Sequence, residues 1–135
     1  MALIVWTDKL SLNIKEIDNQ HKKWIAIIND LNEAMKGGKS KDVLGDVFVR
    51  LIEYTKFHFK FEEDLFEKYS YTEKLTHKMV HQKLVNEVNG YYTDFKSGKL
   101  TVSINLMQLL SNWLIDHIQK KDKEYAPFLI QKGYK

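Results

Sequence analysis

The stretch from residue 106 to residue 117, LMQLLSNWLIDH, is the clearest guide to the fold of this 135-residue chain. Leu106, Leu110, Trp113 and His117 follow one another at spacings of four, three and four, which places them on one face of an α-helix. Three of these four residues are apolar, so this face should point into a core. The pattern therefore predicts that His117 takes the next inward position of the same helix.

Three breaks divide the chain into four segments with this periodicity. Gly37–Gly38 is the first break, and the stretch KSGK at 96–99 is the last. The middle break falls near residues 68–72, where the apolar period lapses and either Ser70 or Thr72 can cap a new helix. We therefore expect helices at about Asp18–Met35, Lys41–Glu67, Thr72–Phe95 and Ser103–Lys120.

The connections between these helices are short, so neighbouring helices should run antiparallel. This predicts an all-α fold, an up-down-up-down antiparallel four-helix bundle, as one domain over residues 1–135. Asp18 is the candidate N-cap of the first helix. Residues 1–17 should form an N-terminal arm, and Pro127 should separate a short C-terminal tail, 124–135, from the last helix.

Composition narrows the class of protein. Hydrophobic residues make up 44% of the chain and charged residues 29%, as in a globular protein, and the formal charge of +3 is too weak to favour a nucleic-acid partner. The chain has no cysteine, which excludes disulfides and thiolate ligands and suits a reducing compartment. With no signal-peptide pattern and no apolar stretch of about 18 residues, we expect a cytoplasmic monomer without a membrane span.

Each of the five histidines lies on the predicted inward face of its helix. Three of them belong to i,i+4 pairs, one paired with a glutamate and two paired with each other, and the last is followed by an aspartate. In an antiparallel bundle, the starts of the first and third helices meet the ends of the second and fourth. The candidate metal ligands are His21, His58, Glu62, His77, His81, His117 and Asp122.

Core packing without a metal is the alternative interpretation of these residues. A lone core histidine is usually a hydrogen-bonded residue, and one i,i+4 pair is weak evidence because such pairs are common on helix surfaces. Here four helices would bury five imidazoles and a carboxylate at one end. Each unsatisfied buried polar group costs about 1–3 kcal/mol, so the total would rival the stability of a small domain, about 5–15 kcal/mol. The pattern therefore favours a metal site.

Imidazole and carboxylate ligands suit iron, copper, zinc or nickel. Five imidazoles, two bridging carboxylates and one bridging oxygen from solvent leave a single open position on two six-coordinate ions, which suits a small diatomic ligand. The difficult residue is Asp122, which lies about 140° round an ideal helix from His117. We therefore expect the helix to loosen or end between these two residues.

The chain resembles the hemerythrins, specifically the single-domain bacterial ones. The resemblance covers nearly the whole chain, and the combination of motifs is far more specific than any one of them. The matching motifs are Asp18-Asn-Gln-His21, His58-x-x-x-Glu62, His77-x-x-x-His81 and Trp113-Leu-Ile-Asp-His117-Ile-x-x-x-Asp122.

This resemblance implies a non-haem centre of two iron ions, with an oxo or hydroxo bridge, that binds O2 reversibly. One iron would be coordinatively full, and the other would keep the open position for O2. The implied ligands are His77, His81 and His117 for the full iron, His21 and His58 for the open iron, and Glu62 and Asp122 as bridges.

The resemblance also indicates an O2 pocket. Phe59, Trp113 and Leu114 correspond to positions that line the pocket in the family, and Trp24, one turn beyond His21, is a further candidate. Ordinary core packing is the alternative role for all four. An apolar pocket would limit water and proton donors beside bound O2.

The expected function is reversible O2 binding by a carrier, store or delivery protein that is not an enzyme, with an O2-consuming oxidase as one candidate partner. A di-iron redox enzyme is the first rival function. Ferritin-like di-iron enzymes carry Glu-x-x-His on two helices, and this sequence contains no such motif. An O2 or iron sensor that acts through a separate partner is the second rival, and a simple metal buffer is the third.

Overall fold

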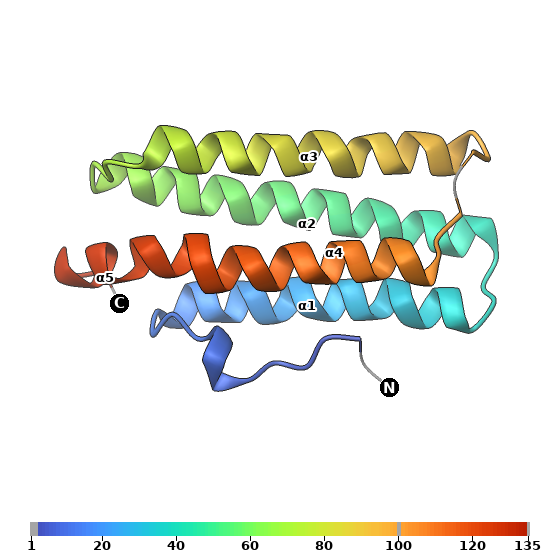
Figure 1. Ribbon diagram of the computed structural model, residues 1–135, viewed down its shortest axis with the longest axis horizontal. Helices are drawn as coiled ribbons and strands as arrows, with labels where there is room; N and C mark the ends of the chain where they lie inside the picture. The colour runs from blue at the N-terminus through green and yellow to red at the C-terminus, as the bar shows by residue number, and fades with distance from the viewer. Residues whose placement is uncertain (1–2, 100, 135) are drawn as a thin grey trace.

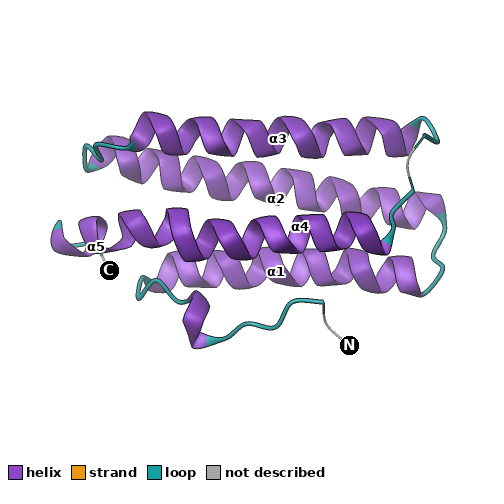
Figure 2. Ribbon diagram, viewed as in Figure 1, coloured by secondary structure: helices purple, strands orange, loops and turns teal. Residues whose placement is uncertain are grey.

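The computed structural model describes residues 3–99 and 101–134. Four long helices run alternately up and down and pack side by side (Figure 1). They are α1 (Lys15–Lys36), α2 (Lys41–Lys68), α3 (Lys74–Lys96) and α4 (Ile104–His117). The described residues contain no strand (Figure 2), and the predicted all-α, antiparallel four-helix bundle is confirmed. None of these helices is long and apolar enough to cross a membrane.

Serine side chains fix the starts of α2 and α4 close to the predicted positions. The Ser40 hydroxyl accepts a hydrogen bond from the Val43 N–H, and the Ser103 hydroxyl accepts one from the Leu106 N–H. Each bond satisfies an N–H group that the first turn of a helix leaves without a partner.

The predicted start of the first helix was wrong. α1 begins at Lys15, and the Asp18 N–H already bonds to the Ile14 carbonyl inside the first turn. The Asp18 carboxylate instead accepts hydrogen bonds from the Ser11 hydroxyl at 2.6 Å and the Leu12 N–H at 2.8 Å. Asp18 therefore ties the N-terminal arm to the helix rather than capping it.

The predicted cap of the third helix was also wrong. α3 begins at Lys74 after Glu73, whose side chain makes no capping hydrogen bond. Ser70 has a φ of 55° and lies in the turn that ends α2, where the Tyr71 N–H bonds to the Phe66 carbonyl. The tight turn requires this left-handed residue, so Ser70 closes α2 instead of starting the next helix.

The expected C-terminal tail is helical, and Pro127 does not separate it from the bundle. After α4 the chain continues through a π-helical segment, η2 (Ile118–Asp122), into α5 (Lys123–Gln131), and Pro127 lies inside α5. A proline inside a helix costs a backbone hydrogen bond. Here Tyr125 and Leu129, both fully buried, anchor α5 to the core and offset that cost.

The N-terminal arm lies along α1 (Figure 1). The Asn29 side chain accepts a hydrogen bond from the Ile4 N–H at 2.9 Å and donates one to the Ile4 carbonyl at 2.8 Å. This pair of bonds holds the arm against one face of α1.

Candidate metal centre

The bundle brings the seven candidate ligands together at one end, where α1 and α3 begin and α2 and α4 end. Each of the seven side chains has at most 4% of its surface exposed. Their nitrogen and oxygen atoms form two groups that share both carboxylates. The larger group comprises Glu62, His77, His81, His117 and Asp122, and the smaller comprises His21, His58, Glu62 and Asp122.

The larger group is built around one oxygen of each carboxylate. The Nε2 atom of His81 lies 3.2 Å from Glu62 Oε1. The Nε2 atoms of His77 and His117 lie 3.2 and 3.1 Å from Asp122 Oδ1. The Nε2 atoms of His81 and His117 also face each other at 3.3 Å. Three imidazoles and two oxygens thus converge on one point.

The smaller group uses the other oxygen of each carboxylate. The Nε2 atom of His21 lies 3.1 Å from Asp122 Oδ2, and the Nε2 atom of His58 lies 3.2 Å from Glu62 Oε2. Glu62 and Asp122 therefore each turn one oxygen toward either group, which is the orientation of a bridging carboxylate. The smaller group has one imidazole fewer than the larger, so the two halves of the site are unequal.

These spacings fit two metal ions. Two ligands bonded to one ion at about 2.0–2.2 Å and at right angles lie about 3 Å apart, close to the observed separations. Many of the converging atoms are buried without a hydrogen-bond partner, and each would cost about 1–3 kcal/mol if it stayed so. They are His21 Nε2, His58 Nε2, His77 Nε2, Glu62 Oε1 and both carboxylate oxygens of Asp122.

A change of helix type places Asp122 in the site. The segment Ile118–Asp122 is π-helical, and the Lys123 N–H bonds to the Ile118 carbonyl five residues back. A π-helix has more residues per turn than an α-helix, so Asp122 comes round to the same face as His117. The predicted loosening of the helix between these two residues is therefore confirmed.

Side chains outside the cluster orient two of the imidazoles. The Nδ1 atom of His58 lies 2.7 Å from Gln20 Oε1, and the Gln20 amide donates to Glu16. The Nδ1 atom of His81 lies 3.0 Å from Glu63 Oε2. An acceptor at Nδ1 holds the proton there and leaves Nε2 free to bind a metal. Sequence reasoning gave no role to Gln20, which appeared only inside a matching motif, or to Glu63, although each is next to a candidate ligand in the sequence.

Tyr125 is the third residue that sequence reasoning missed. Its buried hydroxyl donates a short hydrogen bond to Glu62 Oε2, the oxygen that faces the smaller group. Burial, together with the nearby carboxylates, raises the pKa of Tyr125 well above its usual value, so the phenol stays protonated. Tyr125 follows Asp122 by three residues, a spacing that would place both on one face of a continuous helix. The sequence analysis did not use this spacing, because it expected residues 124–135 to form a tail separate from the last helix.

The electrostatics of the cluster suit a bound cation. Burial alone would lower the pKa of His21, but its contacts with Asp122 and Glu62 outweigh burial and raise that pKa to about 9. The pKa of His77 is raised to about 9 in the same way. Burial would raise the pKa of both carboxylic acids, yet the surrounding histidines lower it, so both stay ionised. The two negative charges therefore require positive charge beside them.

Three of the four predicted pocket residues, Trp24, Phe59 and Trp113, have rings that contact histidine rings of the cluster. The ring of Trp24 lies 5.2 Å from that of His58, and Trp113 stacks on His117 at 4.4 Å. Trp24, Trp113 and Leu114 line a narrow apolar void of about 10 Å³. Phe59 packs 5.4 Å from Trp24 but lines a separate groove on the surface.

The fold and this site define a four-helix-bundle metalloprotein with a buried histidine and carboxylate centre. The hemerythrin HHE cation binding domain family matches residues 12–129. The chain belongs to the hemerythrin family. Proteins of this family hold non-haem iron and are generally O2-binding carriers.

Individual relatives agree with this assignment. The chain is 39% identical to a bacteriohemerythrin of Pseudomonas aeruginosa (strain LESB58), over 93% of this chain and 81% of the relative. It is 33% identical to a bacteriohemerythrin of Methylococcus capsulatus, over 96% of this chain and 98% of the relative. A crystal structure of wild-type hemerythrin superimposes with a TM-score of 0.89 at 32% identity and covers 93% of this chain and 97% of that one.

Proposed function

We propose that this protein binds O2 reversibly at a centre of two non-haem iron ions, as a carrier, store or delivery protein. The observation that carries the proposal is the pair of unequal ligand groups that share Glu62 and Asp122. Equal groups would suit two equivalent ions, whereas the missing imidazole in one group leaves room for a small ligand.

The ligand roles follow from the two groups. His77, His81 and His117 would hold one iron, and His21 and His58 would hold the other. Glu62 and Asp122 would bridge the pair through the oxygens that face each group. When bound, the iron pair supplies the electrons that O2 takes up on binding and returns on release.

The protein's own contribution is to position these side chains and keep the site dry. Gln20 and Glu63 hold two imidazoles with Nε2 turned inward, and the Tyr125 hydroxyl holds Glu62. Trp24 packs against His58 of the smaller group, and Trp113 packs against His117 of the larger group. Indole side chains carry no acidic group that could protonate bound O2, so they favour release of intact O2 over its reduction.

The test is an optical and metal analysis of the purified protein loaded with ferrous iron under anaerobic conditions. The proposal requires two irons per chain and a band that appears with O2 and disappears under vacuum over repeated cycles. Rapid, irreversible conversion to the ferric form would instead indicate a redox enzyme. Zinc without iron in protein purified from cells would indicate a metal buffer.

A further inference from the structure

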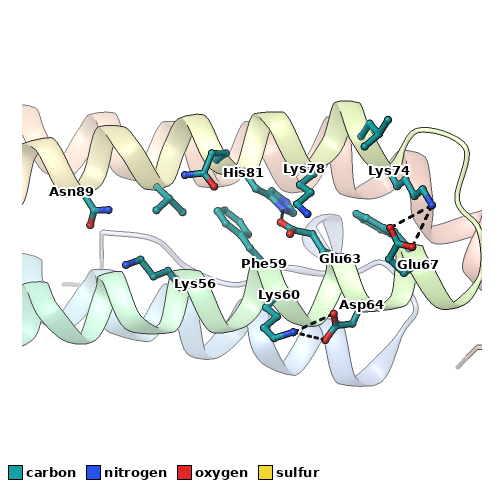
Figure 3. A pocket seen from close by; sticks show the side chains of 14 residues that line it. Lys56, Phe59, Lys60, Glu63, Asp64, Glu67, Lys74, Lys78, His81 and Asn89 are labelled. Carbon is teal, nitrogen blue, oxygen red and sulfur yellow. Dashed lines mark hydrogen bonds and ion pairs between the residues drawn. The ribbon is translucent and has the colours of Figure 1, made fainter.

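A surface groove of about 540 Å³ runs between α2 and α3 (Figure 3), and it reaches one residue of the metal cluster from outside. His81, one of the candidate ligands, lines it. Phe59 lies flat against the His81 ring, with centroids 3.7 Å apart and planes 2° from parallel. Glu63, which has 24% of its side chain exposed, bonds to His81 Nδ1. The groove therefore leads from solvent to an imidazole of the cluster.

The charges along this groove do not cancel. Lys60 pairs with Asp64 at 3.2 Å, and Lys74 pairs with Glu67 at 3.3 Å, as the dashed lines in Figure 3 show. The Glu63 carboxylate is held by His81. That leaves two exposed lysines in the lining, Lys56 and Lys78, without an anionic partner within the described part of the chain. The two lysines come from opposite sides of the groove, Lys56 from α2 and Lys78 from α3 (Figure 3).

Two exposed apolar side chains flank Lys78 on α3. Leu75, in the groove lining, has 70% of its surface exposed, and Met79, one turn further along α3, has 73%. Small-molecule sites are enclosed and mostly apolar, whereas seven of the fourteen residues that line this groove are charged. An open groove with protruding apolar residues and a positive rim instead suits a transient protein partner with a negative surface.

We propose that this groove docks a small acidic protein that passes single electrons to the iron centre through His81. The inference rests on the proposed function, because an iron pair left ferric when O2 departs as peroxide, without returning its two electrons, does not bind O2 again until it is reduced. Each ferric ion accepts one electron and becomes ferrous, and the donor protein is oxidised by one electron. Two donor encounters restore the pair.

The experiment follows reduction of the iron-loaded, fully oxidised protein by stopped-flow absorbance. The probe is reduced plant-type ferredoxin, a small acidic protein with a low reduction potential. The test variant is Lys56→Glu/Lys78→Glu. The matched control is Lys36→Glu/Lys39→Glu, which changes the net charge equally at exposed positions near the opposite end of the bundle. The methyl viologen radical cation serves as a second, positively charged reductant.

Electrostatic steering changes association rates by about 10- to 1,000-fold and weakens as salt rises. We therefore expect the test variant to be reduced by ferredoxin at least about 10-fold more slowly than the unaltered protein at low salt, with a flatter salt dependence. The control variant should change less than about 2-fold, and viologen should reduce neither variant more slowly.

Equal slowing in both variants, or slowing in neither, would overturn the docking proposal. Slowing with viologen as well would show that the substitutions damage the centre and would also count against it. These outcomes are separate from a failure of the proposed function, which would appear as the absence of a reversible O2 band in the unaltered protein.

Discussion

Replacement of Tyr125 by phenylalanine removes one hydroxyl from the metal end of the bundle and leaves the ring in place. The ring contacts, such as Phe66 at 5.0 Å and His77 at 5.5 Å between centroids, do not involve the hydroxyl. What is lost is the hydrogen bond to Glu62. Hydrogen bonds to charged groups contribute about 1.5–3 kcal/mol, so the variant should lose about that much unfolding free energy.

Urea unfolding of the metal-free protein measures this loss, and it corresponds to a fall in Tm of roughly 5–11 °C for a chain of this size. Tyr71→Phe is the matched control, because Tyr71 is also buried against Tyr125 but its hydroxyl makes no hydrogen bond within the described residues. A loss below about 0.5 kcal/mol in Tyr125→Phe, or an equal loss in the control, would refute the hydrogen-bond assignment.

Three further predictions concern the cluster. His58→Ala should abolish the O2 band, because it removes one of the two imidazoles of the smaller group, and an unchanged spectrum would mean that the ligands are wrongly assigned. Chelation of the metal should lower Tm, because metal binding to the folded cluster contributes to the free energy of folding, and an unchanged Tm in a thermal scan would argue against a buried centre. In the metal-free protein, His21 and His77 have a pKa of about 9 against an ordinary 6.5. Their contribution to stability is therefore full below pH 6.5 and is lost as pH rises through about 9, and urea unfolding that shows constant or rising stability over that window would contradict this charge state.

The helices were predictable from sequence where local chemistry decides the structure. The spacing of Leu106, Leu110 and His117 indicated the inward face of α4, and Ser40 and Ser103 marked helix starts through short-range hydrogen bonds. Asp18 failed as a cap because its carboxylate found partners in the N-terminal arm. A local pattern does not reveal which of two competing partners a side chain will take.

The C-terminal region was predicted least well, because packing overrides propensity there. Judged from the local sequence, Pro127 predicts the end of a helix. In the structure α5 continues past Pro127, because burial of Tyr125 and Leu129 stabilises it. Because residues 124–135 were expected to form a separate tail, the contact between Tyr125 and Glu62 was not predicted. The spacing of His117 and Asp122, by contrast, did reveal that a regular helix was impossible, and the π-helical segment is its structural solution.

Under the proposed function, two irons lie in two unequal groups of ligands joined by Glu62 and Asp122. The most direct test is a crystal structure of the iron-loaded protein with anomalous diffraction measured at the iron edge. We expect two iron peaks at the metal end of the bundle. One should lie among His77, His81 and His117, and the other beside His21 and His58. A single peak, or a peak away from these side chains, would contradict the claim.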